Sequence, residues 1–300
     1  MLPTPGPLAP LQRRVGMAIV SRVGGDDPLA RRADTVDKPG PRWFTPSDPI
    51  WRVHDDAAMF SSGVTALLLQ SLHPLAMAGV TGHSGYKSDP WGRLQRTSDY
   101  IGRTTFGTVG DAEAMIARVR GVHERVRGKD FRGRPYRASD PRLLEWVHVA
   151  EIWSFLAGHR AYGNDPLTSA DEDRYVEQAG RSAARLGVID PPTNVAALEA
   201  SIEGFRPELE VSPAAVEAAT FLLDEPPLQW WARPAYGLLA QGGLALLQPW
   251  AAAMLGLEQP RSGLVRGRLG VSTVRWGLAG VGSRSPRPNQ ANSSQANPDR

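Results

Sequence analysis

Residues 89–128 read DPWGRLQRTSDYIGRTTFGTVGDAEAMIARVRGVHERVRG, and the rest of the fold is expected to form around this stretch. Asp89-Pro90 predicts a helix start, because the carboxylate caps free N–H groups and proline at the first helical position loses no hydrogen bond. Gly107 is expected to end this helix, and Asp111 is the expected cap of the next one. Two consecutive helices are therefore predicted here.

Each of these two helices carries polar side chains on the stripe that should face inward. The first stripe combines two arginines with smaller and aromatic residues: Arg93, Arg96, Thr97, Tyr100, Ile101 and Thr104. The second places one imidazole among apolar residues: Met115, Ile116, Val119, His123 and Val126. Inward-facing arginines are costly unless an anionic group meets them, so the first stripe indicates an anionic partner.

Asp-Pro pairs at 48–49 and 140–141 repeat the helix-start signal. Helical periodicity follows both, and His73-Pro74 interrupts the first pattern, which places His73 at a kink where its ring can be aimed into a pocket. The helix after residue 140 carries a second imidazole on its inward stripe, one turn from a carboxylate: Leu144, Val147, His148, Glu151 and Phe155.

The second half of the chain also has helical patterns. Ser169 and Glu172 form a capping-box pattern that opens a helix ending near Gly187. Shorter helices are expected over residues 194–204 and 213–223, and no convincing alternating strand or Asn-Gly hairpin is present. The predicted fold class is therefore all-α.

Three hundred residues with 41% apolar composition can bury one sizeable core, so we expect one helical domain over residues 41–280. Residues 1–40 are expected to be a flexible arm and residues 281–300 a disordered tail, because both lack sustained periodicity. The absence of cysteine excludes disulfides, iron–sulfur clusters and thiolate sites, so any metal would need histidine, carboxylate, lysine or tyrosine ligands.

The net charge of +3 is unevenly distributed, because residues 260–300 contain seven arginines and one aspartate. This tail is interpreted as solvated, with contact to phosphate or anionic lipid as the alternative, and no nucleic-acid-binding module accompanies it. Residues 1–16 lack an apolar run typical of a signal peptide, and a cytoplasmic protein is expected.

Residues 234–257 contain no charge and are formally long enough to span a bilayer. Pro249 divides them into two segments that are each too short, so a buried helical pair is predicted and no transmembrane span. A weak contact with a membrane surface through Trp230, Trp231 and the basic tail is the alternative. The glycine-rich segment 78–92 does not have the spacing of a phosphate-binding loop, which argues against nucleotide chemistry.

Three of the six histidines lie at an apolar stripe or a kink and are candidate ligands: His73, His123 and His148. His54 and His159 are expected to be surface or local-packing residues, and His83 is expected to make a hydrogen bond within the glycine-rich loop.

Ordered motifs along the chain resemble the MpaB/rubber oxygenase (latex clearing protein) catalytic domain family. They are LLLQSLHPLAMAGVTGHSGYKSDPWGRLQRTSDYI at 67–101, HERVRG at 123–128, YRASDPRLLEWVH at 136–148, Leu186-Gly187 and Pro191-Pro192-Thr193. The resemblance spans roughly residues 50–260. It implies a helical domain with a globin-like core around haem b, which acts as an oxygenase with dioxygen on a lipophilic isoprenoid or other alkene. The electron donor is not identified by the sequence.

The resemblance also implies roles for individual residues. His123 matches the proximal iron ligand, with His148 or Glu151 fixing its second ring nitrogen and His73 as a further cofactor contact. The family's distal motif is an arginine, a lysine three residues later and a threonine directly after it. Arg93 and Thr97 match and would act on dioxygen, Arg93 by stabilising developing negative charge.

Arg96 replaces the family's lysine, and a guanidinium has no free lone pair for iron. Pairing with a haem propionate is the role expected for it, and the distal iron position is expected to be open or water-bound. The acidic residue that serves as base in rubber cleavage has no match, since Met77 lies near its place, so rubber is not the expected substrate.

Three other interpretations remain open from the sequence. A non-haem iron site would use His73, His123, His148 and Glu151 as ligands. A non-catalytic helical protein would use the same pocket for a lipid or pigment. Both arginines would instead bridge helices if they paired with Asp99, Glu113 or Glu124.

Overall fold

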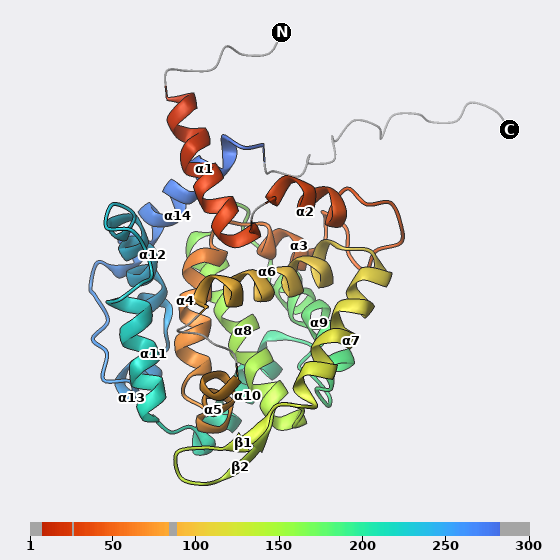
Figure 1. The fold of residues 1–300 in the computed structure, drawn as a ribbon, viewed down its shortest axis with the longest axis vertical. Coiled ribbons are helices and arrows are strands. Elements are labelled where there is room, and N and C mark those ends of the chain that lie inside the picture. Colours follow the sequence, from red (N-terminus) through yellow and green to blue (C-terminus); the bar gives the residue numbers. More distant parts are fainter. Residues whose placement is uncertain (1–7, 26, 84–88, 283–300) are drawn as a thin grey trace, which may run out of the picture.

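The computed structural model describes residues 8–25, 27–83 and 89–282. Within these residues, fourteen α-helices, one 3-10 turn and one two-stranded hairpin make an all-α fold, as predicted (Figure 1). The first seven helices are α1 (Ala9–Gly24), α2 (Pro28–Thr35), α3 (Pro49–His54), α4 (Met59–Gln70), α5 (Pro74–His83), α6 (Pro90–Phe106) and α7 (Val109–His123). The others are α8 (Pro141–Tyr162), α9 (Ser169–Leu186), α10 (Val195–Phe205), η1 (Arg206–Glu208), α11 (Pro213–Leu223), α12 (Arg233–Leu246), α13 (Pro249–Met254) and α14 (Gly263–Ala279).

The Asp-Pro signals start helices where the sequence predicts them. The Asp89 carboxylate accepts a hydrogen bond from the Gly92 amide at 2.9 Å, and Asp140 accepts one from the Arg142 amide at 2.9 Å. Proline occupies the first turn of both helices, where its missing N–H costs nothing.

Two predicted caps are wrong by a few residues. Thr108 caps α7, and Asp111 lies three positions later with its amide bonded to the Thr108 hydroxyl at 3.3 Å. Thr168 and Asp171 form the capping box of α9, one residue before the predicted pair. The physical reason is the same in both cases, because a threonine hydroxyl three residues before an aspartate satisfies the free amide at the helix start.

The helices α4 and α8 form the centre of the core (Figure 1). Leu68 and Leu69 of α4 and Trp146 of α8 are fully buried. The Trp146 indole N–H donates to the Gln70 carbonyl oxygen at 3.1 Å, at the point where α4 ends. Pro74 then starts α5, and the axes of α4 and α5 are bent by 109° relative to each other. The interruption predicted at His73-Pro74 is therefore confirmed.

The helices α1, α12 and α14 pack together as a layer on one side of the molecule (Figure 1). Glycines allow their backbones to approach closely, since a Cβ on Gly267 of α14 would lie 2.7 Å from the Gly242 Cα of α12. Gly16 of α1 meets Gly277 of α14 in the same way. The uncharged stretch 234–257 forms α12 and α13, so the predicted helical pair is confirmed.

No single helix among the described residues has the length and apolar composition to cross a bilayer, and only the bent pair α4 and α5 reaches that threshold together.

Two expectations are corrected by the structure. The arm expected over residues 1–40 contains α1 and α2, because α1 gains packing against α14 that local sequence periodicity does not reveal. The polar turn after α7 contains an antiparallel hairpin of β1 (Arg127–Lys129) and β2 (Pro135–Arg137). Residues 283–300 of the expected tail lie outside the described residues.

Candidate active site

A cavity of about 1530 Å³ lies within the helical domain. Its walls come chiefly from α4, α5, α6 and α8, with a smaller part from α7, and are mainly apolar, with a few polar groups among them. Small-molecule sites usually measure about 300–1000 Å³, so this cavity has room for a large cofactor together with a second molecule.

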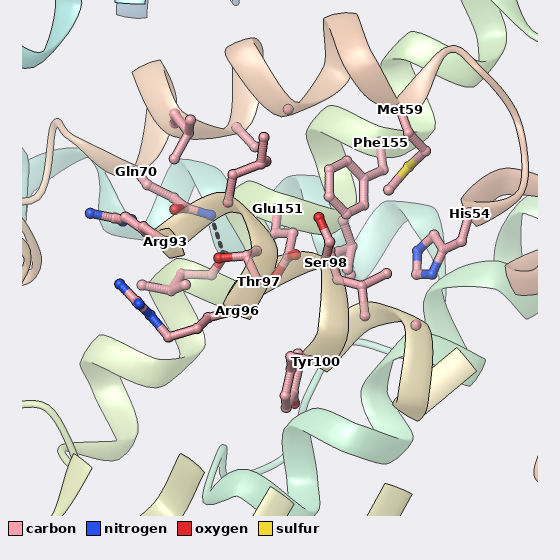
Figure 2. A pocket seen from close by; sticks show the side chains of 18 of the residues that line it. His54, Met59, Gln70, Arg93, Arg96, Thr97, Ser98, Tyr100, Glu151 and Phe155 are labelled. Carbon is pink, nitrogen blue, oxygen red and sulfur yellow. Dashed lines mark hydrogen bonds between the residues drawn. The ribbon is translucent and has the colours of Figure 1, made fainter. Parts of the chain in front are cut away.

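The predicted inward stripe of α6 lines this cavity in full: Arg93, Arg96, Thr97, Tyr100, Ile101 and Thr104. Figure 2 shows Arg93 and Arg96 extending toward the same end of the cavity, away from His54. The cavity therefore has a cationic end formed by one helix.

The two arginines differ in their surroundings. Arg93 is half-buried, whereas the Arg96 side chain is 59% exposed and pairs with Asp89 at 3.1 Å. Of the acidic partners considered from sequence, Asp99 pairs with Arg103 at 3.1 Å and Glu113 pairs with Arg185 at 2.7 Å. Exposed ion pairs contribute little to stability, so the Arg96–Asp89 pair leaves Arg96 able to exchange partners.

His123 is the last residue of α7 and lines the cavity together with Val119 and Val126 of the predicted stripe. Its Nδ1 is buried and has no hydrogen-bond partner among the described residues. Burial lowers the pKa of His123, so the imidazole is neutral at physiological pH. A neutral imidazole with an unpartnered nitrogen is the form that binds a metal.

The inward stripe of α8 also lines the cavity as predicted: Leu144, Val147, His148, Glu151 and Phe155. The His148 Nε2 is buried without a hydrogen-bond partner among the described residues, and burial lowers its pKa to about 4. Burial raises the pKa of Glu151 to about 7. The neighbouring Tyr100 has a pKa raised to about 12 by burial and, more weakly, by Glu151.

His54 is a cavity residue that the sequence did not single out. Its Nδ1 lies 2.8 Å from the Thr105 hydroxyl and its Nε2 lies 3.4 Å from the Tyr175 hydroxyl. Burial lowers the pKa of His54 to about 3. The only local signal was its place at the end of α3 beside two aspartates, which suggested a surface residue, whereas its partners come from distant parts of the chain.

The structure does not bring His73 to the cavity. Its ring is 3% exposed and packs between Trp146 and Phe205, with centroid distances of 6.2 and 6.4 Å. Its Nε2 lies 3.7 Å from a Glu208 carboxylate oxygen. The bend at Pro74 directs this ring toward η1 and α10, so His73 is not among the described residues that line the cavity.

The two remaining histidines each lie close to a backbone carbonyl oxygen. His83 ends α5 at the cavity rim, with its Nε2 3.2 Å from the Arg127 carbonyl oxygen, as the expected hydrogen bond requires. His159 is buried, and its Nε2 lies 2.9 Å from the Asp165 carbonyl oxygen.

The cavity offers one imidazole and two arginines that a haem would use. Within residues 8–25, 27–83 and 89–282, no three histidine, aspartate or glutamate side chains come close enough to hold one metal ion. Haem brings four nitrogen ligands of its own, so the protein would need to hold the iron through a single imidazole, which His123 would supply. Arg93 and Arg96 offer cations for carboxylate groups in the same cavity.

Glu151 makes the stability of the cofactor-free protein depend on pH. Below pH 4.5, its usual pKa, the carboxyl is protonated in both the folded and the unfolded chain. As the pH rises, the unfolded chain loses the proton first, so the free energy of unfolding falls until about pH 7, where the folded chain also loses it. We expect Glu151→Gln to raise the free energy of unfolding at pH 8 by up to about 3 kcal/mol, with a much smaller effect at pH 5. Urea unfolding at the two pH values measures this, and equal effects at both would contradict it.

The catalytic domain family described as ER-bound oxygenase mpaB/B′/rubber oxygenase matches residues 51–276. No curated protein and no solved structure matches the chain significantly. The matched range extends from α3 into α14 and includes every helix that carries a cavity residue discussed above. The chain belongs to the mpaB/rubber oxygenase catalytic domain family.

Proposed function

We propose that the chain is a haem b-dependent oxygenase that uses dioxygen on a lipophilic isoprenoid or other alkene. Membership of an oxygenase family supports the reaction class. The observation that carries the haem proposal is His123, a neutral imidazole with an unpartnered buried nitrogen on a cavity of about 1530 Å³. Bound haem would supply the iron at which dioxygen is activated.

The residues around the cavity have separate roles in this proposal. His123 would hold the haem iron through its imidazole, and His148 of α8 would support the bound cofactor. Arg96 pairs with a propionate in exchange for its exposed partner Asp89. Arg93 would offer cationic N–H donors to negative charge that develops in the cavity, and the Thr97 hydroxyl would donate a hydrogen bond to a bound oxygen species or to water.

Glu151 is the group in the cavity that can hold or release a proton near neutral pH. Its pKa of about 7 lies close to the pH at which a general acid or base is most effective. The acid expected from the family has no match in the sequence, and Met77, which lies near its expected place, is buried in α5 and lines the same cavity. Glu151 enters the cavity from α8, so the proton would be exchanged at its carboxyl oxygens from a different helix.

The apolar walls favour a lipophilic substrate. Leu67 and Leu75 from the α4–α5 side and Phe221 and Leu222 from α11 line the cavity away from the arginines' helix. Such walls bind an alkene by removing its surface from water and also keep water from the reacting atoms.

The test is reconstitution of the purified full chain with haemin. We expect one haem per chain, a Soret band, and a shift of that band when dithionite reduces the iron. Porphyrin and metal quantification of the same sample separates the alternatives. Iron without porphyrin would favour a non-haem site, and a co-purified lipophile with no haem uptake would favour a lipid- or pigment-binding protein; either result would overturn the haem proposal.

A further inference from the structure

Exposed large apolar side chains are concentrated on α1, α14 and the connection that leads into α12. Of the sixteen such side chains in the described part of the chain, nine lie there: Leu8, Leu11, Met17, Trp230, Trp231, Leu264, Val265, Leu269 and Trp276. Trp230 is 82% exposed and Trp231 58% exposed. An isolated exposed apolar residue is ordinary, but a concentration that includes adjacent tryptophans marks an interaction surface.

The same elements are strongly basic. Residues 9–24 and 233–282 together contain eight arginines and a single acidic residue, Glu258. One of these arginines, Arg275, is paired with Asp56 at 2.7 Å, whereas Arg13, Arg14, Arg266 and Arg268 are among the exposed ones. Apolar and cationic side chains on one layer of helices are complementary to an anionic lipid surface. The apolar side chains would contact the lipid tails, and the arginines would contact the anionic headgroups.

The outward face of α14 shows this combination within one helix. Its buried positions include Gly263, Gly267, Gly270 and Gly277, which pack against the neighbouring helices. Its exposed positions include Leu264, Val265, Arg268, Leu269 and Trp276. The close glycine packing fixes this face to the rest of the domain, so it is presented without a large change in fold.

The tryptophan pair lies beside the cavity. Pro226, Pro227 and Leu228 line the cavity, and Trp230 follows two residues later in the same connection between α11 and α12. Tryptophan prefers the boundary between lipid tails and headgroups, because its ring is apolar and its indole N–H is polar. Anchoring at Trp230 and Trp231 would therefore bring the lipid surface to the rim of the cavity.

We infer that the layer of α1, α12 and α14 docks on an anionic lipid bilayer, with Trp230 and Trp231 as interfacial anchors and the arginines as headgroup contacts. Docking itself does not depend on haem. Delivery of a lipophilic substrate from the bilayer into the cavity is its consequence and rests on the proposed oxygenase function.

The experiment is flotation of the purified full chain with two kinds of vesicle, one of phosphatidylcholine alone and one of phosphatidylcholine mixed with phosphatidylglycerol. We expect binding to the anionic vesicles that weakens with added salt. The double variant Trp230→Ser/Trp231→Ser is expected to weaken it by about tenfold or more, because interfacial binding scales with buried apolar area. Arg13→Gln/Arg14→Gln is expected to weaken it by roughly 30-fold, at about 1 kcal/mol for each of the two basic residues.

The matched control is Ile189→Ser/Val216→Ser, which removes two exposed apolar side chains, 67% and 49% exposed, from outside the layer. Its vesicle affinity is expected to stay within about twofold of the unmodified protein, since these side chains do not meet the lipid. Absence of binding to anionic vesicles, or equal loss in the control, would overturn the inference. So would a dimer in solution that the tryptophan variant converts to a monomer without any vesicle binding, because the layer would then be an interface between two copies.

Discussion

Replacement of His123 by alanine is expected to remove the Soret band from haemin-treated protein while leaving the helical fold intact. The reason is that the imidazole proposed to hold the haem iron is lost. Loss of a supporting group around a metal site typically costs 10–100-fold in affinity, so loss of the ligand itself should exceed about 100-fold. Haemin titration followed at the Soret band, with far-ultraviolet circular dichroism on the same samples, measures both parts of the expectation.

Two further variants separate ligation from packing at this site. His123 is the last residue of α7, where a glycine costs a helix little, so His123→Gly should fold and should recover a Soret band when free imidazole is added. His148→Ala should retain a Soret band with weaker haem affinity. Normal haem content in His123→Ala, or complete loss in His148→Ala with retention in His123→Ala, would show that the axial assignment is wrong.

The helical fold was largely predictable because its start signals are local. An aspartate before a proline needs only its own neighbours to cap a helix, and α3, α6 and α8 begin at such pairs. The helix α1 carries no comparable signal, and its position depends on Gly16 meeting Gly277. A contact between residues that far apart cannot be seen in local periodicity, which explains why an arm was expected there.

The cavity walls were predictable for a related reason. Helical spacing determines which side chains share a face, so the sequence alone predicts which side chains of α6 and α8 face the cavity. The position of His54 depends on Thr105 and Tyr175 from two other helices, so spacing could not reveal it. His73 was misplaced for the opposite reason, since a kink tells where a side chain leaves a helix but not which neighbour it meets.

Arg93 and Arg96 look equivalent in the sequence, but their surroundings predict different effects. We expect Arg93→Met to weaken binding of azide to the ferric, haemin-reconstituted protein by about 10- to 100-fold, because a charge-assisted hydrogen bond contributes roughly 1.5–3 kcal/mol. Arg96→Met is the matched control, with the same change of side chain one helical turn away. Its effect on azide should stay below about threefold, because Arg96 is 59% exposed and already paired with Asp89, and exposed pairs contribute little.

The readout distinguishes the two roles because azide is an anion of fixed chemistry that needs no knowledge of the substrate. If Arg93 serves the oxygen side of the cavity, its loss lowers azide affinity while the Soret band and haem content stay unchanged. If Arg96 instead meets a propionate, its loss should weaken haemin uptake and leave azide affinity nearly unchanged. If both variants weakened azide binding equally, the arginines would act only through the general positive potential at this end of the cavity. That result would contradict a specific role for Arg93.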